Sequence, residues 1–459
     1  MESISRQIAK FALGLQYKDL PPKVVDEVKR FLYDSIGCAF GGYTTNDVQI
    51  VRNIYAELGG KPEATVIGSG DKIPAYNATL LNSLMVRALD FNDIYWKQDP
   101  SHPSDLIPVA LAVGERGRKS AKDVITAIVL AYEFECRLCE FAIPGIRERK
   151  WHHASLTQFV SPIVAGYLLD LSEDQMVNAI GISGSHNFTL GAATAGQLTM
   201  MKNTVDPLAA QSGVMAALMA KQGYTGTEPI FEGKEGLMQT LGPEWNVERL
   251  VGGLGQHYKI LGCSMKAFPT EALTHSHITA TLKVVTEHDI KPVDIEEVTI
   301  TTIARAVDIL FDPEKYRPTS RETADHSLPY CIAAAIVDRK ITREQFQGDR
   351  ITDPEIQSVL PKIKGEASQE FEKMFPEKQP SKVTVRLKNG QMYSAQVEYP
   401  KGDPREPMSN EDLENKFRSL ASGLISDKKQ QEIKEAIWNL ESFKYTSEFM
   451  DLLRVDEDA

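Results

Sequence analysis

The chain has 459 residues, of which 42% are hydrophobic and 25% are charged, so it has enough apolar surface to build a large buried core. Its 51 Lys and Arg residues against 63 Asp and Glu residues give a net charge of −12. This acidic balance argues against a nucleic-acid-binding protein, which normally carries a basic surplus. It does not exclude a small anionic substrate, because a few lysines in a pocket can outweigh an acidic exterior locally.

The cysteine pattern and the hydropathy predict a cytoplasmic protein without a membrane segment. The five cysteines are irregularly spaced, which is typical of a reducing compartment and not of a disulfide framework. Cys136 and Cys139 lie inside a helical pattern with no second pair nearby, which favours a place on a helix face over a metal or redox site. The longest apolar run, residues 124–132, is far shorter than the ~20 residues of a membrane span.

Up to about residue 265 the sequence predicts one helix after another. Ser120 and Ser172 each open a capping-box pattern, and these patterns predict helices over 120–139 and 172–186. Asp206 and Pro207 predict the start of a helix that ends near Gly223.

After about residue 265 strand patterns appear among the helices. Residues 296–305 are rich in β-branched side chains, and 382–388 and 391–399 alternate around Asn389-Gly390, a two-residue hairpin signal. Further helices are expected near 327–337, over 353–359 and from Ser409 onward. We therefore expect a mainly α protein, with a large all-helical domain formed by both chain ends (1–265 and 405–459) and a smaller inserted α+β lid domain (266–404).

The densest polar segment runs from Asp90 to Asp105 and includes His102. It connects two apolar helices, and loops on a rigid scaffold commonly carry function. A solvated loop in which Asp90 and Ser104 cap helices is an equally good interpretation.

Three further segments offer charged side chains. Arg147 and neighbouring cations precede His152 and His153, a set that can receive carboxylates but that also resembles a basic surface turn. Lys202 lies beside an expected helix N-terminus, whose positive field suits an anion, although an exposed turn lysine is the commoner case. In the stretch 325–330, His326 and Tyr330 are spaced to share one helical face.

No phosphate-binding loop, dinucleotide fingerprint, nucleophile elbow or His-Glu-x-x-His motif occurs in the sequence. His275 and His277 also lack the spacing of a helical zinc site. The chemistry of an enzyme with this sequence would rest on histidine, carboxylate, tyrosine and lysine, which favours proton-transfer reactions.

Taken together and in this order, these segments resemble the MmgE/PrpD family of 2-methylcitrate dehydratases and cis-aconitate decarboxylases. The resemblance is carried by residues 88–93, 101–105, 151–155, 198–213, 266–275 and 325–330. It implies a helical domain built from both termini, a smaller α+β lid, a homodimer, and activity without a metal or organic cofactor.

The resemblance also implies which residues form the site. The family's active-site positions fall on Asp90, His102, His152, Lys202, Lys266 and Tyr330. Glu271 stands where the decarboxylases have a histidine, which is more like the dehydratase branch. We expect Glu271, Lys97 and Arg147 to join the two lysines in binding the substrate.

We hypothesise a lyase that removes water from a β-hydroxy di- or tricarboxylate, with 2-methylcitrate or citrate as the expected substrate. Lys202 and Lys266 would hold carboxylates, and His102 and His152 would act as base and acid, with Tyr330 as another proton donor. Asp90 would orient a histidine. The alternatives are a cis-aconitate decarboxylase or dicarboxylate epimerase, a non-catalytic helical binding or scaffold protein, and a metal-dependent hydrolase.

Overall fold

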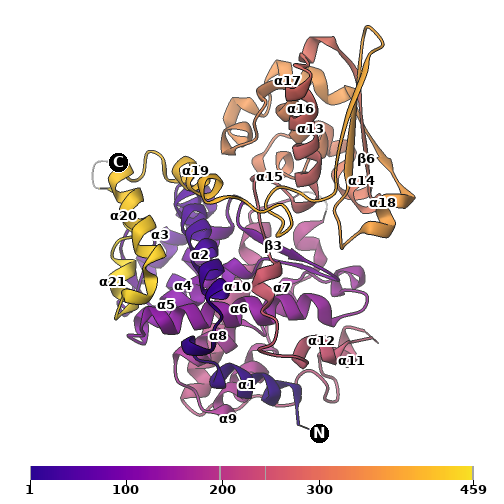
Figure 1. Cartoon of the computed structure of the whole chain (residues 1–459). Coiled ribbons are helices and arrows are strands. Elements are labelled where there is room, and N and C mark those ends of the chain that lie inside the picture. Colours follow the sequence, from indigo (N-terminus) through magenta and orange to yellow (C-terminus); the bar gives the residue numbers. More distant parts are fainter. Residues whose placement is uncertain (1, 196–197, 243, 457–459) are drawn as a thin grey trace.

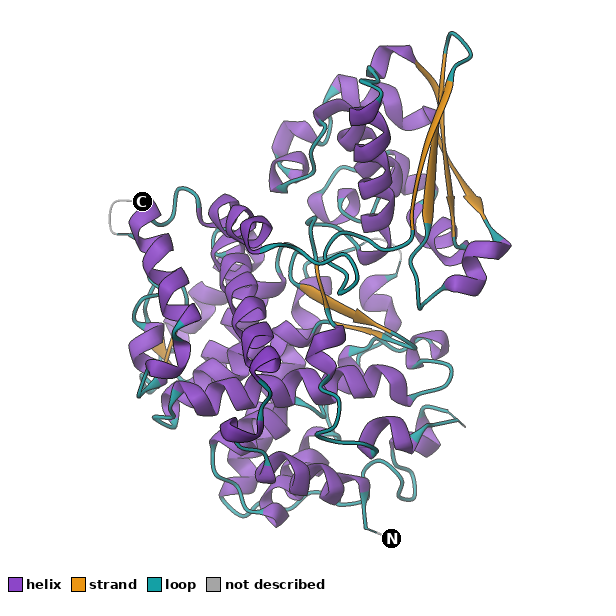
Figure 2. Cartoon of the chain, viewed as in Figure 1, coloured by secondary structure: helices purple, strands orange, loops and turns teal. Residues whose placement is uncertain are grey.

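The computed structural model describes residues 2–195, 198–242 and 244–456, and these residues form a mainly α protein, as predicted (Figures 1 and 2). The buried apolar side chains fall into two main clusters. One joins residues 4–265 to residues 408–453, and the other joins residues 272–395 to Trp96. We call these parts of the chain the helical body and the lid. The domain boundaries at 266 and 404 stay a prediction, which this separation of the apolar clusters supports.

The helical body is built around α10, which packs against α4, α8 and α9. The C-terminal helices return to the body, where α19 and α20 contact α2 (Figure 1). No helix among the described residues combines the length and the apolar character needed to cross a membrane. The body helices are α1 (Ile4–Gly14), α2 (Pro22–Gly42), α3 (Asn46–Leu58), α4 (Ala75–Arg87), α5 (Ile107–Arg116), α6 (Ala121–Phe141), α7 (Ala154–Thr157), α8 (Ser161–Leu168), α9 (Glu173–Ser183), α10 (Met201–Lys221), α11 (Leu237–Thr240), α12 (Val247–Val251), α19 (Asn410–Ala421), α20 (Asp427–Trp438) and α21 (Thr446–Met450).

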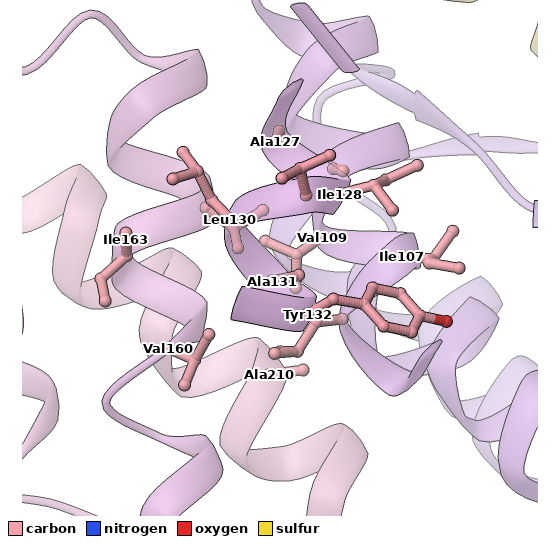
Figure 3. Close-up of a cluster of buried hydrophobic side chains, with 14 of the residues drawn as sticks. Ile107, Val109, Ala127, Ile128, Leu130, Ala131, Tyr132, Val160, Ile163 and Ala210 are labelled. Carbon is pink, nitrogen blue, oxygen red and sulfur yellow. The ribbon is translucent and has the colours of Figure 1, made fainter. Parts of the chain in front are cut away.

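Apolar side chains from α5, α6 and α10 meet next to α8 in the core of the body (Figure 3). The predicted capping box at Ser120 is present, and α6 runs from it through the core. Cys136 and Cys139 are buried free thiols on α6, as the helix-face interpretation predicts.

The predicted start of α10 is wrong by five residues. The helix begins at Met201 and contains Pro207, which costs it one backbone hydrogen bond. Packing of α10 against α4, α8 and α9 offsets that cost. Because the helix begins at Met201, Lys202 lies in its first turn.

The lid is a four-stranded sheet with helices packed against it, in the strand order β7-β6-β8-β9. The β6–β7 pair is parallel, whereas β6–β8 and β8–β9 are antiparallel. Helix α13 covers β8 and β9 and also contacts α16. The lid elements are α13 (His275–Glu287), β6 (Ile295–Thr302), α14 (Ala304–Leu310), α15 (Arg321–Ala324), α16 (Leu328–Asp338), α17 (Pro354–Val359), β7 (Ile363–Ala367), α18 (Gln369–Met374), β8 (Ser381–Leu387) and β9 (Met392–Val397).

Two lid predictions need correction. The hairpin at Asn389-Gly390 is present, but its connection spans residues 388–391, and Gly390 takes the left-handed conformation (φ 86°). The strand predicted over 296–305 stops at Thr302, and Arg305 belongs to α14.

Short strands form two small sheets in the body, one from β1 (Ala64–Thr65) and β2 (Lys72–Ile73). In the other, β3 (Asp93–Trp96) lies between β4 (Pro100–Ser101) and β5 (Ser264–Met265). Asp93 pairs with Met265 in this sheet, so the polar segment after Asp90 lies against the chain that leads to Lys266.

Candidate active site

A cavity of about 730 Å³ lies between the body and the lid, within the ~300–1,000 Å³ typical of small-molecule sites. Most of the predicted site residues line it. These are Asp90, His102, Arg147, His152, Lys202, Lys266 and Glu271.

Tyr330 and Lys97 do not line the cavity, and this corrects two predictions. The hydroxyl of Tyr330 is buried in the lid and donates to the backbone carbonyls of Gln345 and Arg350. Helix α16 begins only at Leu328, after Ser327 as its cap, so His326 and Tyr330 do not share a helical face. Lys97 forms an ion pair with Glu377 of the lid at 2.9 Å.

Asp90 is the centre of a buried cluster of cations. Its carboxylate accepts from Lys202 Nζ at 2.9 Å, from Lys266 Nζ at 2.5 Å and from the guanidinium of Arg87. Burial acts to raise the pKa of Asp90, but these three cations hold it well below its usual value. Asp90 therefore orients lysines, and the expected ion pair with His102 or His152 is not present.

The ring of His102 is fixed by its own loop. Nδ1 lies 2.6 Å from the carbonyl oxygen of Asp93, so it must donate, and the neutral ring presents the lone pair of Nε2. Burial lowers the pKa of His102 well below its usual value, and the positive charges of Arg87 and Lys266 lower it further. His102 is thus a neutral imidazole with a free acceptor.

His152 has the opposite arrangement. Its Nδ1 accepts a hydrogen bond of 3.1 Å from the backbone N–H of Ala154, so the neutral ring carries its proton on Nε2. Burial lowers the pKa of His152 well below its usual value, and His153 adds to the effect. Nε2 of His102 can accept a proton, and Nε2–H of His152 can donate a hydrogen bond.

His153 is a cavity residue that the sequence analysis did not select. Its ring is close to both other rings, with centroids 4.0 Å from His152 and 5.6 Å from His102. Its Nε2 is 3.3 Å from a carboxylate oxygen of the buried Asp206. The adjacent pair His152-His153 was visible in the sequence, but only His152 was predicted as a site residue.

His152, His153 and Asp206 offer ligand atoms within 4.8 Å of one another, the candidate metal set in the described part of the chain. The two imidazole planes are tilted by 34° to each other. Nδ1 of His152 already accepts from the Ala154 N–H, and Nε2 of His153 faces Asp206 at 3.3 Å.

The lid contributes His326 to the cavity lining. This histidine belongs to the stretch 325–330 but was not predicted as a site residue. Its Nδ1 donates to Asp325 at 2.5 Å, and its Nε2 is 3.8 Å from Asp90. Burial and the charge of Lys202 lower the pKa of His326 to about 4.

The cavity lining carries more cations than acids, although the protein as a whole is acidic. Seven Lys and Arg side chains and five Asp and Glu side chains line it. One of the acids, Glu271, accepts from the backbone N–H of Leu273 at 2.7 Å, and burial raises its pKa. The lining therefore favours an anionic ligand, and its neutral histidines provide groups for proton transfer.

A helical body, an α+β lid and a cationic, histidine-lined cavity between them define a class of protein whose domain-junction cavity suits an anion. Family models support a closer assignment. The MmgE/PrpD N-terminal domain matches residues 6–250, and the MmgE/PrpD C-terminal domain matches residues 268–442. The chain belongs to the MmgE/PrpD family.

Named relatives fall into two groups. Proteins named cis-aconitate decarboxylase, from Aspergillus terreus and Homo sapiens, are each 26% identical to the chain. The alignments cover 98% and 99% of this chain and 96% and 95% of those relatives. A 2-methylcitrate dehydratase from Escherichia coli is 23% identical over 94% of this chain and 93% of its own length.

Proposed function

We propose that the protein is a lyase that removes water from a β-hydroxy polycarboxylate of the citrate type. The observation that carries this proposal is the opposite hydrogen bonding of two neutral histidines in one cationic cavity. His102 offers an acceptor at Nε2, and His152 offers a donor at Nε2. A β-elimination needs both, because one group takes a proton from carbon and another assists the departing hydroxyl.

The cations bind and activate the substrate. A proton next to a carboxylate is only weakly acidic, so the negative charge that develops on that carboxylate must be stabilised. Lys202 and Lys266 are fixed by Asp90 and supply two ammonium groups for its one carboxylate. Lys202 spends one N–H donor on Asp90 and has two more for a substrate carboxylate, whereas Lys266 donates to Asp90 and Thr270 with all three and acts on the substrate through its charge.

His102 Nε2 takes the proton from carbon, and the imidazolium that forms gives this proton to the hydroxide that leaves as water. His152 Nε2–H donates a hydrogen bond to the leaving oxygen and stays neutral. His102 is neutral again after this transfer, and the cycle is closed. Burial lowers the pKa of His102, and the charges of Arg87 and Lys266 lower it further. A bound polyanion offsets those charges, raises that pKa and so makes His102 a better base.

The test is an ultraviolet assay for a new conjugated C=C bond with citrate and the 2-methylcitrate stereoisomers. We expect absorbance to rise with one of these acids and to be lost in His102→Gln. No turnover of any hydroxy acid by folded protein would overturn the proposal.

Decarboxylation of cis-aconitate is the second candidate, favoured by the 26% identity and near-complete coverage of relatives with that name. The same cavity could protonate the carbanion that remains when CO₂ leaves. Release of CO₂ from cis-aconitate, without hydration or dehydration, would identify this reaction.

A further inference from the structure

A lysine of the lid faces the cavity without a partner. Lys315 lies in the short 3-10 helix Pro313–Tyr316 and is 7% exposed. Its side chain lines the cavity, yet its Nζ forms no hydrogen bond or ion pair with any residue that the structure describes. An ammonium group that is withdrawn from water and unpaired is costly unless a ligand anion completes it.

Lys315 is held in place by its backbone. The hydroxyl of Ser327 donates to the carbonyl oxygen of Lys315 at 2.5 Å, and Ser327 directly follows His326. Lys315 and His326, which both line the cavity, are therefore linked through the hydrogen bond of Ser327. Burial lowers the pKa of Lys315, while the nearby acids Asp312 and Asp325 oppose that effect.

Lys315 has no carboxylate partner among the described residues, unlike the two lysines that bind Asp90. Lys202 and Lys266 share a protein carboxylate, so part of their charge is already balanced. The other lid cation at the cavity, Arg305, is paired with Glu148 of the body. Lys315 is thus the lid cation of the cavity lining that makes no direct ion pair with a described residue, although Glu271, Asp312, Glu314 and Asp325 lie near enough to influence its charge.

We propose that Lys315 binds one carboxylate of the substrate from the lid side, separately from the carboxylate held by Lys202 and Lys266. This inference rests on the proposed function and assigns one more binding residue for its citrate-type acid. A tricarboxylate has a carboxylate for Lys315 in addition to those bound on the body side, so we expect its binding to depend on Lys315 more than the binding of a dicarboxylate does.

Equilibrium binding tests this without turnover. Isothermal titration of the full chain would use propane-1,2,3-tricarboxylate, which has no hydroxyl group to eliminate, and succinate as the dicarboxylate. We expect Lys315→Met to weaken binding of the tricarboxylate roughly 10–100-fold, the value of a charge-assisted hydrogen bond, and to change succinate binding less than twofold. Lys315→Arg should recover part of the loss, since it restores the charge. The matched control is Lys97→Met, a lysine of the body–lid contact that lies outside the cavity lining.

The outcomes separate this inference from the proposed function. If folded Lys315→Met binds the tricarboxylate with the same affinity as the wild-type protein, Lys315 does not have this role. The lyase proposal would be unaffected by that result. Equal losses for both acids would overturn the tricarboxylate preference. Failure of the wild-type protein to bind either acid would instead contradict the proposed function. Lys315→Gln replaces Lys315→Met if circular dichroism shows that the latter is unfolded.

Discussion

Asp90 and Lys266 are 176 positions apart in the sequence, yet Nζ of Lys266 donates to the Asp90 carboxylate at 2.5 Å. The same ammonium group donates to the backbone carbonyl of Thr270 at 3.1 Å. Pairing of β3 with β5 brings the two segments together. The result is a buried carboxylate that fixes the cations of the body side of the cavity.

Asp90→Asn should destabilise the protein. It leaves Arg87, Lys202 and Lys266 buried without their shared carboxylate, and breaking a buried ion pair typically costs about 3–5 kcal/mol. Urea unfolding measures the loss. The control is Glu377→Gln, which removes exposed ion pairs with Lys97 and Arg405 and should cost about 1 kcal/mol or less. Equal stabilities of the two variants would contradict the central role of Asp90.

His102→Gln and His152→Gln should each lower kcat by roughly 10²–10⁴ with the fold retained, since His102 transfers the proton and His152 hydrogen-bonds to the leaving oxygen. His186→Gln changes an exposed histidine outside the cavity lining and should leave kcat unchanged. Nitrogen-15 NMR of the imidazoles provides a second readout. It should find the proton of neutral His102 on Nδ1 and that of neutral His152 on Nε2, and the same tautomer in both would refute the division of roles.

Local patterns in the sequence predicted the elements whose signals lie within a few residues. The capping box at Ser120 and the helix with Ser327 at its start are in this group. The pairing of β3 with β5 could not be predicted, because a two-residue strand has too little pattern and its partner is far away in the sequence.

The same distinction holds for the site. His102, His152 and Lys266 were predicted because their motifs resemble those of a family. His153 and Lys315 were missed because their roles depend on their surroundings. His153 lies beside the ring of His152, and Lys315 lines the cavity without an ion-pair partner among the described residues. Tyr330 shows the converse, since it lies in a recognised motif but points into the lid core.

Tyr330→Phe should therefore leave kcat within about twofold of the wild-type value. It removes a hydroxyl that donates to two backbone carbonyls, and such a loss costs roughly 0.5–1.5 kcal/mol of stability. Steady-state kinetics and urea unfolding on one preparation check both values. A hundredfold loss of kcat at normal stability would restore Tyr330 as a catalytic residue.

The pH dependence of kcat/KM should have its acid limb below the ordinary histidine pKa of ~6.5, because kcat/KM reports the free enzyme and burial lowers the pKa of His102 there. The alkaline limb should lie below the ordinary lysine value of ~10.4, since burial also lowers the pKa of Lys266. Rates with the identified substrate across pH 5–10 measure both limbs. An acid limb above 7 would show that His102 is not the base in the free enzyme.

Folding stability should fall as the pH drops from ~6.5 towards 4. His277 and His326 are buried neutral, with the pKa of each lowered to about 4, chiefly by burial. Below ~6.5 the unfolded chain binds protons at these residues, whereas the folded chain does not, so protonation favours unfolding until the pH reaches the folded pKa. Urea midpoints at pH 7, 6 and 5 should decrease in order. In His277→Gln, a variant of a lid histidine outside the cavity lining, the decrease should be smaller, and an unchanged slope would show that His277 is not neutral in the folded protein.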